Sequence, residues 1–267
     1  MPVPAFRIGC SGWNYKHWRG NFYPSELPIR EWFTHYSRVF DTVEINNTFY
    51  KLPEPETFNA WRERAPEDFI YAIKASRFLT HLKRLREPEE AVSRLFERAC
   101  HLRAHLGPVL YQLPGSFHID LVRLDDFLAV LPRTLGEINS EPCDQPIRHA
   151  IEFRHPSWYV NETQAVLRAH GAVMCLHDKH GSAIVEPLDT PFLYLRFHGP
   201  SGRYFGRYEF KRLKSWATRL AEQWRAGRDV FAYFNNDPEG MAVINAQELR
   251  ALVIAEIEGD ARQRRMR

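Results

Sequence analysis

The stretch RHAIEFRHPSW, Arg148 to Trp158, predicts a buried strand that ends in chemically active side chains. Side chains alternate between the two faces of a strand, so Glu152 and Arg154 share one face. Ile151 and Phe153 share the other face, which is apolar. A surface strand of an antiparallel sheet could carry this pattern by turning its charged face to water, and for an isolated segment that interpretation would be the better one.

The same pattern recurs in four other segments, each of which begins apolar and turns polar toward its C-terminal end: DTVEINNTFY (41–50), FIYAIKAS (69–76), VLYQLP (109–114) and FLYLRFHG (192–199). Strands separated by helical stretches favour a parallel sheet covered by helices. In a (β/α)8 barrel the C-terminal strand ends converge on one mouth. We therefore predict the α/β class and a single TIM barrel over residues 1–267.

The remaining strands and the helices follow from hydrophobic spacing and from glycine and proline positions. Further strands are expected in FRIGCSGW (6–13), AVMCLHD (172–178) and DVFAYFNN (229–236), and helices over 29–40, 53–66, 89–106, 120–131, 161–170, 208–225 and 243–257. Gly107 is expected to end one helix, and Asn161 with Gln164 to cap another. We expect a surface loop over residues 136–146. The loop before Pro191 is expected to carry an irregular or degenerate helix, and the tail from about 259 to 267 is expected to be disordered.

The composition limits the kinds of protein to which this chain can belong. Of the 267 residues 44% are hydrophobic and 26% are charged, which is typical of a soluble globular chain. No apolar run has the length of a membrane span, and the N-terminus lacks a signal core, so we expect a cytoplasmic protein without membrane partners. The four cysteines form no CxxC pair, which favours reduced, buried thiols.

Charge argues against a dedicated nucleic-acid protein, because the net charge is only +3. Basic residues nevertheless concentrate in HLKRLR (81–86), GRYFGRYEFKRLK (202–214) and ARQRRMR (261–267). The first and last are interpreted as solvated faces. The oligomeric state is not indicated.

Ionisable side chains at the strand ends form the main candidate site: Glu44, Lys74, Glu152, Arg154, Asp178, Arg196 and His198. Carboxylates near cations suit acid/base chemistry, because charge and burial move their pKa values apart. We assign catalytic roles to Glu44, Glu152, Lys74 and His198, with Glu152 or Glu44 as general base and His198 as proton donor. Lys74, Arg154 and Arg196 would hold anionic oxygens, whereas a structural ion-pair layer is the alternative.

Further side chains are expected to bind substrate. Trp13 and Tyr15 follow a glycine-rich turn and could form a stacking wall, with buried aromatic packing as the alternative. The loops 198–208 and 234–240 suit a phosphate or another anion, because barrels often bind phosphate after strands seven and eight. The substrate-binding set also takes in other positions of the predicted mouth: Asn46, Gln112, Trp158, Arg203, Tyr204, Asn235 and Asn236.

No cofactor is required by the sequence. A divalent metal held by Glu44, Glu152, Asp178, His177 and His198 is an alternative, but nearby lysine and arginine would compete with a cation. The sequence has no GxSxG elbow, Walker A motif or GxGxxG after a strand. These absences disfavour a serine hydrolase, a P-loop NTPase and a Rossmann dehydrogenase.

Seven motifs, spanning Ile8 to Ala246, carry a family resemblance: IGCSGWNYKHWRGNFYP, VEINNTFYKLP, KASRFLTH, LGPVLYQLP, EFRHPSW, YLRFHG and YFNNDPEGMAVINA. In this order they resemble the family labelled domain of unknown function 72, also called YecE-like. The resemblance implies a TIM barrel and supplies no established reaction. Gly115 departs from the proline expected after QLP, which bears on a turn only. The barrel is also similar in kind to those of endonuclease IV and xylose isomerase, an analogy of fold alone.

Three functions remain open. The first is an enzyme, hydrolase-like or isomerase-like, whose barrel mouth binds a polar, phosphate-bearing or sugar-like substrate. The second is a nucleic-acid-binding or DNA-repair-like protein whose aromatic loops stack on bases while its basic runs hold phosphates. The third is a non-catalytic module that binds a small ligand.

Overall fold

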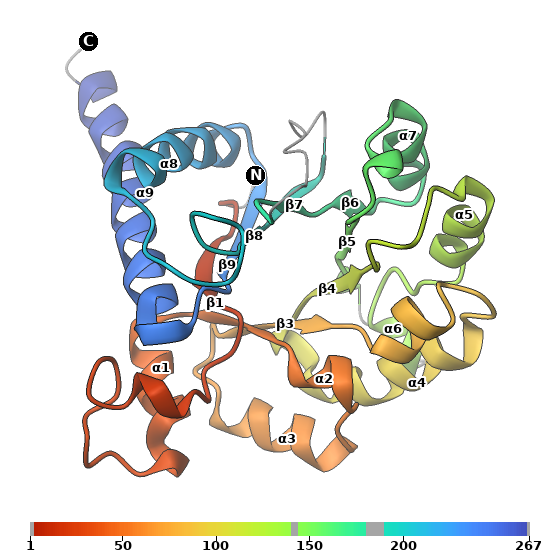
Figure 1. Ribbon diagram of the computed structural model, residues 1–267, viewed down its shortest axis with the longest axis horizontal. Helices are drawn as coiled ribbons and strands as arrows, with labels where there is room; N and C mark the ends of the chain where they lie inside the picture. Colours follow the sequence, from red (N-terminus) through yellow and green to blue (C-terminus); the bar gives the residue numbers. More distant parts are fainter. Residues whose placement is uncertain (1–2, 140–143, 180–189, 266–267) are drawn as a thin grey trace.

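The computed structural model describes residues 3–139, 144–179 and 190–265, and its centre is a parallel sheet that forms a nearly closed barrel (Figure 1). The strands are β1 (Phe6–Cys10), β2 (Thr42–Ile45), β3 (Ile70–Lys74), β4 (Leu106–Gln112), β5 (His149–Glu152), β6 (Val173–Met174), β7 (Leu176–His177), β8 (Phe192–Phe197) and β9 (Asp229–Phe234). Their order around the sheet is β6-β5-β4-β3-β2-β1-β9-β8-β7.

The two ends of this strand order belong to one segment of chain. Only Cys175 separates β6 from β7, and β6 pairs with β5 while β7 pairs with β8. The Cys175 amide donates to the carbonyl of Ile151 at 2.8 Å. The sixth predicted strand is therefore one broken strand that links the two edges of the sheet, and the predicted TIM-barrel fold is confirmed.

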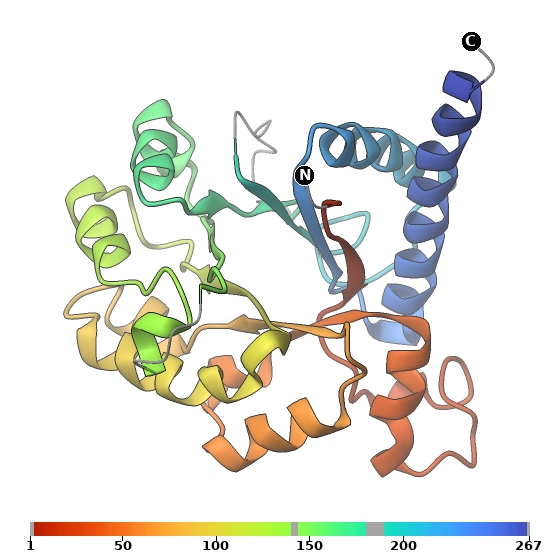
Figure 2. The same cartoon turned by 180° about the vertical axis from the view of Figure 1, so that it is seen from behind.

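Helices surround the sheet on its outer face (Figures 1 and 2). They are α1 (Trp32–Val39), α2 (Asn47–Tyr50), α3 (Pro55–Arg64), α4 (Glu89–Ala99), α5 (Leu121–Ala129), α6 (Gly136–Asn139), α7 (Asn161–Ala169), α8 (Phe210–Arg225) and α9 (Met241–Arg265). A π-helical turn covers Phe78–Leu82, and 3-10 turns cover Lys16–Trp18, Ile29–Glu31, Cys100–His105, Pro156–Trp158 and Pro238–Gly240. Among these described helices, none is long and apolar enough to cross a membrane.

Alternation along the strands divides the core into two layers, as predicted. Side chains of one face fill the barrel: Ala72, Leu110, Ala150, Val173, Cys175, Phe192, Tyr194, Phe231 and Tyr233. The opposite face, which includes Val43, Ile73 and Ile151, packs against the helices. The polar residues near the end of each strand lie on the same strand face as these inner side chains. They therefore point into the barrel at its C-terminal end.

One boundary differs from the expectation. Gly107 does not end a helix: α4 stops at Ala99, a 3-10 segment with a kink at Arg103 (φ 51°) follows, and β4 begins at Leu106. Gly107 lies within β4, where a Cβ atom would come within 2.4 Å of Ile70 Cγ2. The glycine is thus needed for close packing of β4 against β3.

Other local details also differ from the expectations. Asn161 is the first residue of α7 and makes no capping bond, because Val160 is the N-cap residue. The short helix α6 forms at the start of the predicted loop 136–146. Helix α9 continues to Arg265, through most of the tail for which disorder was expected. The irregular helix expected before Pro191 falls largely on residues 180–189, outside the described residues.

Candidate functional site

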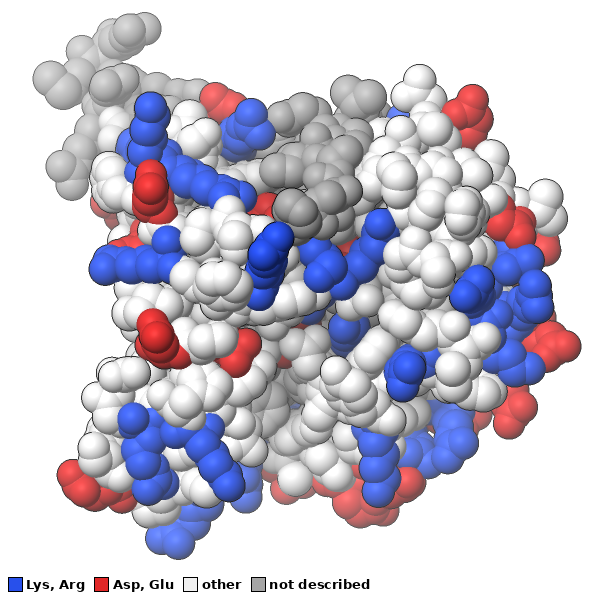
Figure 3. All heavy atoms as spheres, in the orientation of Figure 1, with Lys and Arg blue, Asp and Glu red and all other residues white. Residues whose placement is uncertain are grey.

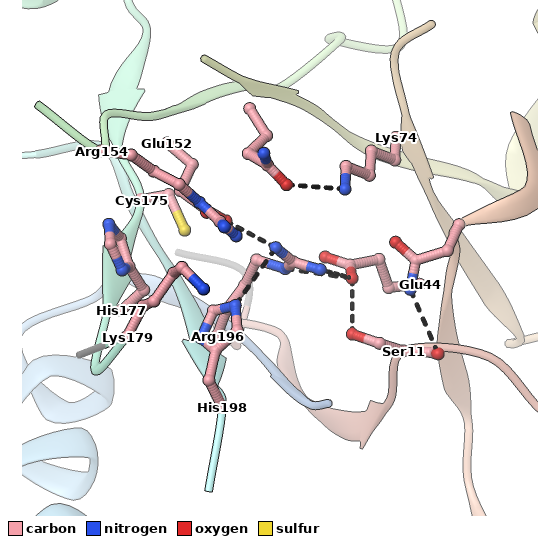
Figure 4. A network of polar contacts seen from close by, with 12 residues as sticks. Ser11, Glu44, Lys74, Glu152, Arg154, Cys175, His177, Lys179, Arg196 and His198 are labelled. Atoms are coloured by element: carbon pink, nitrogen blue, oxygen red, sulfur yellow. Dashed lines mark hydrogen bonds and ion pairs between the residues drawn. The ribbon is translucent and has the colours of Figure 1, made fainter. Parts of the chain in front are cut away.

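Arg196 is the centre of a buried ionic cluster at the C-terminal end of the barrel (Figure 4). Its Nη1 donates to Glu152 Oε2 at 2.6 Å, and its Nε and Nη2 donate to Glu44 Oε1 at 3.1 and 2.8 Å. The arginine side chain is 1% exposed and both carboxylates are 0% exposed. One guanidinium on β8 therefore links carboxylates from β2 and β5, which are far apart in the sequence.

Glu44 is fully engaged by neighbouring donors. Ser11, immediately after β1, donates through Oγ to Glu44 Oε1 at 2.5 Å. Tyr194, on the same face of β8 as Arg196, donates through its hydroxyl to Glu44 Oε2 at 2.7 Å. Ser11 and Tyr194 are not among the predicted site residues, although the spacing of Tyr194 two residues before Arg196 places both on one strand face.

Glu152 is held by two guanidinium groups. Arg154 Nε lies 2.5 Å from Oε1, and Arg196 occupies Oε2. Burial would raise the pKa of Glu152, but the charges of Arg154 and Arg196 outweigh burial and hold this pKa well below its ordinary value. The general-base role expected for Glu152 therefore does not fit, because a carboxylate held in this way is a poor proton acceptor. Both oxygens of Glu44 also accept hydrogen bonds from neighbouring side chains.

Lys74 lies in the same cluster without a carboxylate of its own in the described part of the chain. Its Nζ donates to Gln112 Oε1 at 2.7 Å and lies 4.1 Å from the centre of the Phe49 ring. Burial lowers the pKa of Lys74 to about 7, and the positive charge of Arg196 acts in the same direction. A substantial fraction of the amine is thus uncharged near neutral pH.

His81 extends this group of side chains toward the surface. Its Nε2 lies 3.4 Å from Gln112 Nε2, and its Nδ1 lies 3.0 Å from Thr80 Oγ1. Burial, followed by the charges of Lys74 and Arg154, lowers the pKa of His81 to about 4. His81 is not among the predicted site residues, because it begins the basic run 81–86, for which a solvated face is predicted.

His198 does not fit the expected role of proton donor. Its Nε2 lies 3.5 Å from Arg196 Nη1, and its side chain is 0% exposed. Burial lowers the pKa of His198 to about 4, so the imidazole is neutral at neutral pH. His177 lies beside it, with ring centres 5.8 Å apart, and the Nδ1 atoms of both rings are buried without a hydrogen-bond partner among the described residues.

Arg154 reaches from the buried cluster to the rim of the mouth. Its Nη1 donates to the hydroxyl of Tyr204 at 3.0 Å, and Lys179 Nζ donates to the same oxygen at 3.1 Å. Lys179 Nζ also lies 4.4 Å from the centre of the Tyr204 ring. Two cations therefore converge on one oxygen at the edge of the site. Lys179 was not predicted, because it follows rather than ends its strand.

Asp178 is a structural anchor whose carboxylate oxygens are engaged by neighbouring donors. Its side chain is 3% exposed and accepts hydrogen bonds from the His198 amide at 2.7 Å, the Tyr208 hydroxyl at 2.5 Å and Arg212 Nη2 at 2.9 Å. These bonds attach the loop after β8 and the start of α8 to the end of β7. The expected substrate contact is corrected accordingly.

Two of the rings expected to bind substrate, Trp158 and Trp13, pack against other aromatic side chains. Trp158 is fully buried, stacks on Phe153 with ring centres 4.6 Å apart and donates through Nε1 to the carbonyl of Phe117. It is a core residue, so its expected substrate contact is wrong. Trp13 packs edge-on against Phe33 and Trp61, which agrees with the alternative of buried aromatic packing.

Two polar residues near Ser11 lie closer to the cluster. The half-buried Tyr15 donates through its hydroxyl to the carbonyl of Ser11 at 2.6 Å. Asn46 donates through Nδ2 to the same carbonyl at 3.2 Å, while its Oδ1 is buried without a partner in the described structure. Both residues therefore help to position Ser11 beside Glu44.

The predicted anion loops are only partly built for an anion. Asn236 donates through Nδ2 to the carbonyl of Gly206 and to Asn245 Oδ1, so it ties the two loops together. Asn235 is half-buried, and its amide donates to the carbonyl of Phe197. Arg203 is exposed on the surface of its loop.

The alternative metal site is not formed by the described residues, since no three histidine, cysteine or acidic side chains among them lie close enough to share an ion. Arg196 stands between the two carboxylates, where its charge would oppose a cation. Figure 3 shows Lys and Arg side chains spread over the face seen in Figure 1, several of them near its middle, with most Asp and Glu side chains nearer its rim.

Comparisons with known proteins identify relatives of this chain. YunF of Bacillus subtilis is 26% identical over 94% of this chain and 96% of its own length. The crystal structure of a DUF72 family protein from Thermotoga maritima shares 28% identity and a TM-score of 0.76, covering 94% of this chain and 99% of that one. A glycoside hydrolase family 5 enzyme from Prevotella bryantii, at 10% identity, covers 94% of this chain and 96% of its own; its TM-score of 0.52 shows a shared fold alone.

The family model described as "Protein of unknown function DUF72" matches residues 7–266, which is nearly the whole chain. This match agrees with the motifs and with the barrel. The chain belongs to the DUF72 family.

Proposed function

We propose that this protein is an enzyme that acts on a small polar substrate carrying an anionic group, and that Lys74 transfers a proton in the reaction. The observation that carries the proposal is the pairing pattern of the buried cluster. Arg196 and Arg154 bind the carboxylates of Glu44 and Glu152, leaving the Lys74 amine with the neutral Gln112. A buried amine without a counter-ion loses its proton readily, which is the requirement for a general base.

Charge balance supports an anionic substrate. The two buried carboxylates are matched by Arg196 and Arg154, whereas Lys179 and the ionised fraction of Lys74 bring further positive charge to the same mouth. A phosphate or carboxylate would compensate this charge. The polar rim also suits a sugar-like body, whose hydroxyl groups can exchange hydrogen bonds with amide and imidazole groups.

The chemistry open to such a site is proton transfer of the hydrolase or isomerase kind. Uncharged Lys74 would take a proton from a hydroxyl group or from a carbon next to a carbonyl, and the resulting ammonium would return it. The neutral imidazole of His198 can accept or donate a hydrogen bond without adding charge. The carboxylates Glu44 and Glu152 then act as fixed supports that orient Arg196 and Arg154.

The proposal is tested by incubating the protein with a panel of sugar phosphates and sugar acids and following each compound by NMR. Wild-type protein is expected to convert at least one compound, and Lys74→Met to lower the rate by about 10²–10⁴-fold, the usual contribution of a general acid or base. Lys51→Met, at an exposed lysine on the same side of the barrel, is the control. Full turnover by Lys74→Met would refute the role, and ligand binding with no turnover would favour a non-catalytic module.

A second candidate, nucleic-acid binding, has one observation in its favour. Phe78 is 51% exposed and Phe205 is 52% exposed, and both adjoin basic segments of the mouth loops. Exposed rings between cations suit stacking on single-stranded bases. Binding to single-stranded or abasic DNA that weakens steeply with salt would support this candidate, and absence of binding at low salt would remove it.

The proposal includes a cytoplasmic location. In the described part of the chain Cys10 and Cys175 are buried free thiols, which suits a reducing compartment. Immunodetection of the chain in fractionated cells tests the location: the cytosolic fraction is the expected result, and an extracytoplasmic fraction would contradict it.

A further inference from the structure

Tyr204 differs in its hydrogen bonding from the other tyrosines around the mouth. Tyr194 donates its hydroxyl proton to a carboxylate of Glu44, Tyr208 donates to Asp178, and Tyr15 donates to a carbonyl. Each of these bonds opposes loss of the proton. The hydroxyl of Tyr204 instead accepts from Arg154 and from Lys179, and no acceptor for its own proton is found among the described residues.

We infer that Tyr204 is a second proton-transfer group of the mouth, whose phenolate form is stabilised by Arg154 and Lys179 and which is open to a hydroxyl or acidic C–H group of the substrate. The identity of the substrate in this inference rests on the proposed function. The stabilisation of the ionised phenol is argued from contacts within the chain alone. Two charge-assisted donors on one oxygen stabilise the negative charge that appears when the proton leaves.

Among the described residues, three side chains that follow strands contact Tyr204. Arg154 follows β5, Lys179 follows β7, and His198 follows β8 with its ring edge-on to the phenol at 5.0 Å between centres. His198 is neutral, so the two cations set the balance. Burial would raise the pKa of Tyr204, but Arg154 and Lys179 outweigh burial and lower this pKa from its ordinary value.

The backbone holds the phenol in this place. Tyr204 has a φ of 69°, a left-handed conformation that is costly for a bulky residue. Its amide donates to the carbonyl of His198 at 2.5 Å, and a Cβ atom at Gly199 would lie 2.3 Å from the carbonyl oxygen of Phe205. The loop therefore folds tightly back on the end of β8, and this fold brings the Tyr204 ring over His198.

The proton balance of the step is simple. The phenolate oxygen takes a proton from the substrate O–H or C–H, the bonding electron pair stays on the substrate, and Arg154 and Lys179 remain beside the new anionic charge. The phenol then returns the proton to the product or to water. The complementary transfer, donation of a proton to the substrate, falls to the protonated fraction of Lys74.

The ionisation of the Tyr204 phenol is measured without a substrate. Phenolate absorbance is followed during a pH titration of wild-type protein and of Tyr204→Phe. The difference between the two curves is expected to show one phenol that ionises below the ordinary value of about 10. Lys179→Met should move this transition to higher pH, because it removes one of the two cations. Tyr50→Phe, at a residue that is 80% exposed, is the matched control.

Two results would overturn the inference. One is a difference curve with no ionisation below pH about 10, or one that Lys179→Met leaves unchanged. The other is Tyr204→Phe with full kcat on a compound that wild-type protein converts, where a loss of about 10²–10⁴-fold is expected. Either result can occur while Lys74→Met still abolishes turnover, so failure of the inference is distinguishable from failure of the proposed function. A wild-type protein that converts no compound while Tyr204 titrates early would instead remove the proposed function and, with it, the transfer step.

Discussion

Arg196 and Lys74 face the same two buried carboxylates, and Arg196 binds both of them while Lys74 binds neither. A guanidinium can donate in several directions at once, so it reaches Glu44 and Glu152 together. The lysine is left with an amide partner. The reactivity proposed for Lys74 thus depends on Arg196.

Removal of Arg196 is expected to destabilise the fold strongly. Arg196→Met leaves two carboxylates buried without their shared cation, a change that costs about 3–5 kcal/mol. The free energy of unfolding in urea measures this cost. Arg203→Met, at an exposed arginine, should change stability by no more than about 0.5 kcal/mol. Equal stabilities of the two variants would show that the cluster is not coupled to folding.

Stability is expected to fall on mild acidification because of buried neutral histidines. Burial lowers the pKa of His149 to about 4, whereas an unfolded histidine has a pKa of about 6.5. The unfolded chain therefore binds the proton first, and the stabilisation, present in full above pH 6.5, is lost as the pH falls toward 4, by up to about 3 kcal/mol.

Urea unfolding at several pH values tests this dependence. His149→Gln should flatten the slope between pH 6.5 and 4, and the exposed His118→Gln should leave it as in the wild type. A slope in His149→Gln as steep as that of wild-type protein would contradict the assignment.

Close packing at Gly107 predicts a sharp difference between two glycines. Gly107→Ala forces a methyl group to within 2.4 Å of Ile70 Cγ2, and such overpacking costs about 1–3 kcal/mol. Gly115→Ala meets no atom nearer than 3.9 Å and is expected to be close to neutral. Thermal unfolding of both variants checks the difference, which disappears if β4 and β3 can separate without cost.

Asp178 is expected to control the order of the loop after β8. Asp178→Asn weakens the bonds to Tyr208 and Arg212, so the loop should open more often. The rate of trypsin cleavage after Arg203 and Arg207 reports this opening and should increase several-fold. Asp125→Asn, at an exposed aspartate paired with His170, is the control. Unchanged cleavage in Asp178→Asn would mean that other contacts hold the loop.

The sequence predicted the barrel and the inner column of polar side chains because both follow from local periodicity. Alternation alone places Glu152 and Arg196 on the inside of their strands, and the structure bears this out. Alternation cannot show which side chains then pair. That Arg196 binds both carboxylates depends on how distant strands meet around the barrel, so the pairing of Glu152 with two guanidinium groups could not be predicted from the sequence.

Side-chain burial is the other property that the sequence alone does not predict. The sequence shows that Trp158 follows a strand, but not that its ring lies under Phe153 with no exposed surface. In the same way His81 belongs to a basic run by sequence, and only the π-helical turn Phe78–Leu82 places it beside Gln112. Such contacts depend on loop conformation, which residue periodicity does not determine.

The central claim is most directly tested by the pKa of Lys74 in the folded protein. Competitive labelling of amines with acetic anhydride over a range of pH, read by peptide mass spectrometry, gives this value, with the exposed Lys51 as internal control. The account predicts that Lys74 titrates at about 7. A pKa for Lys74 near the ordinary value of about 10.4 would contradict it.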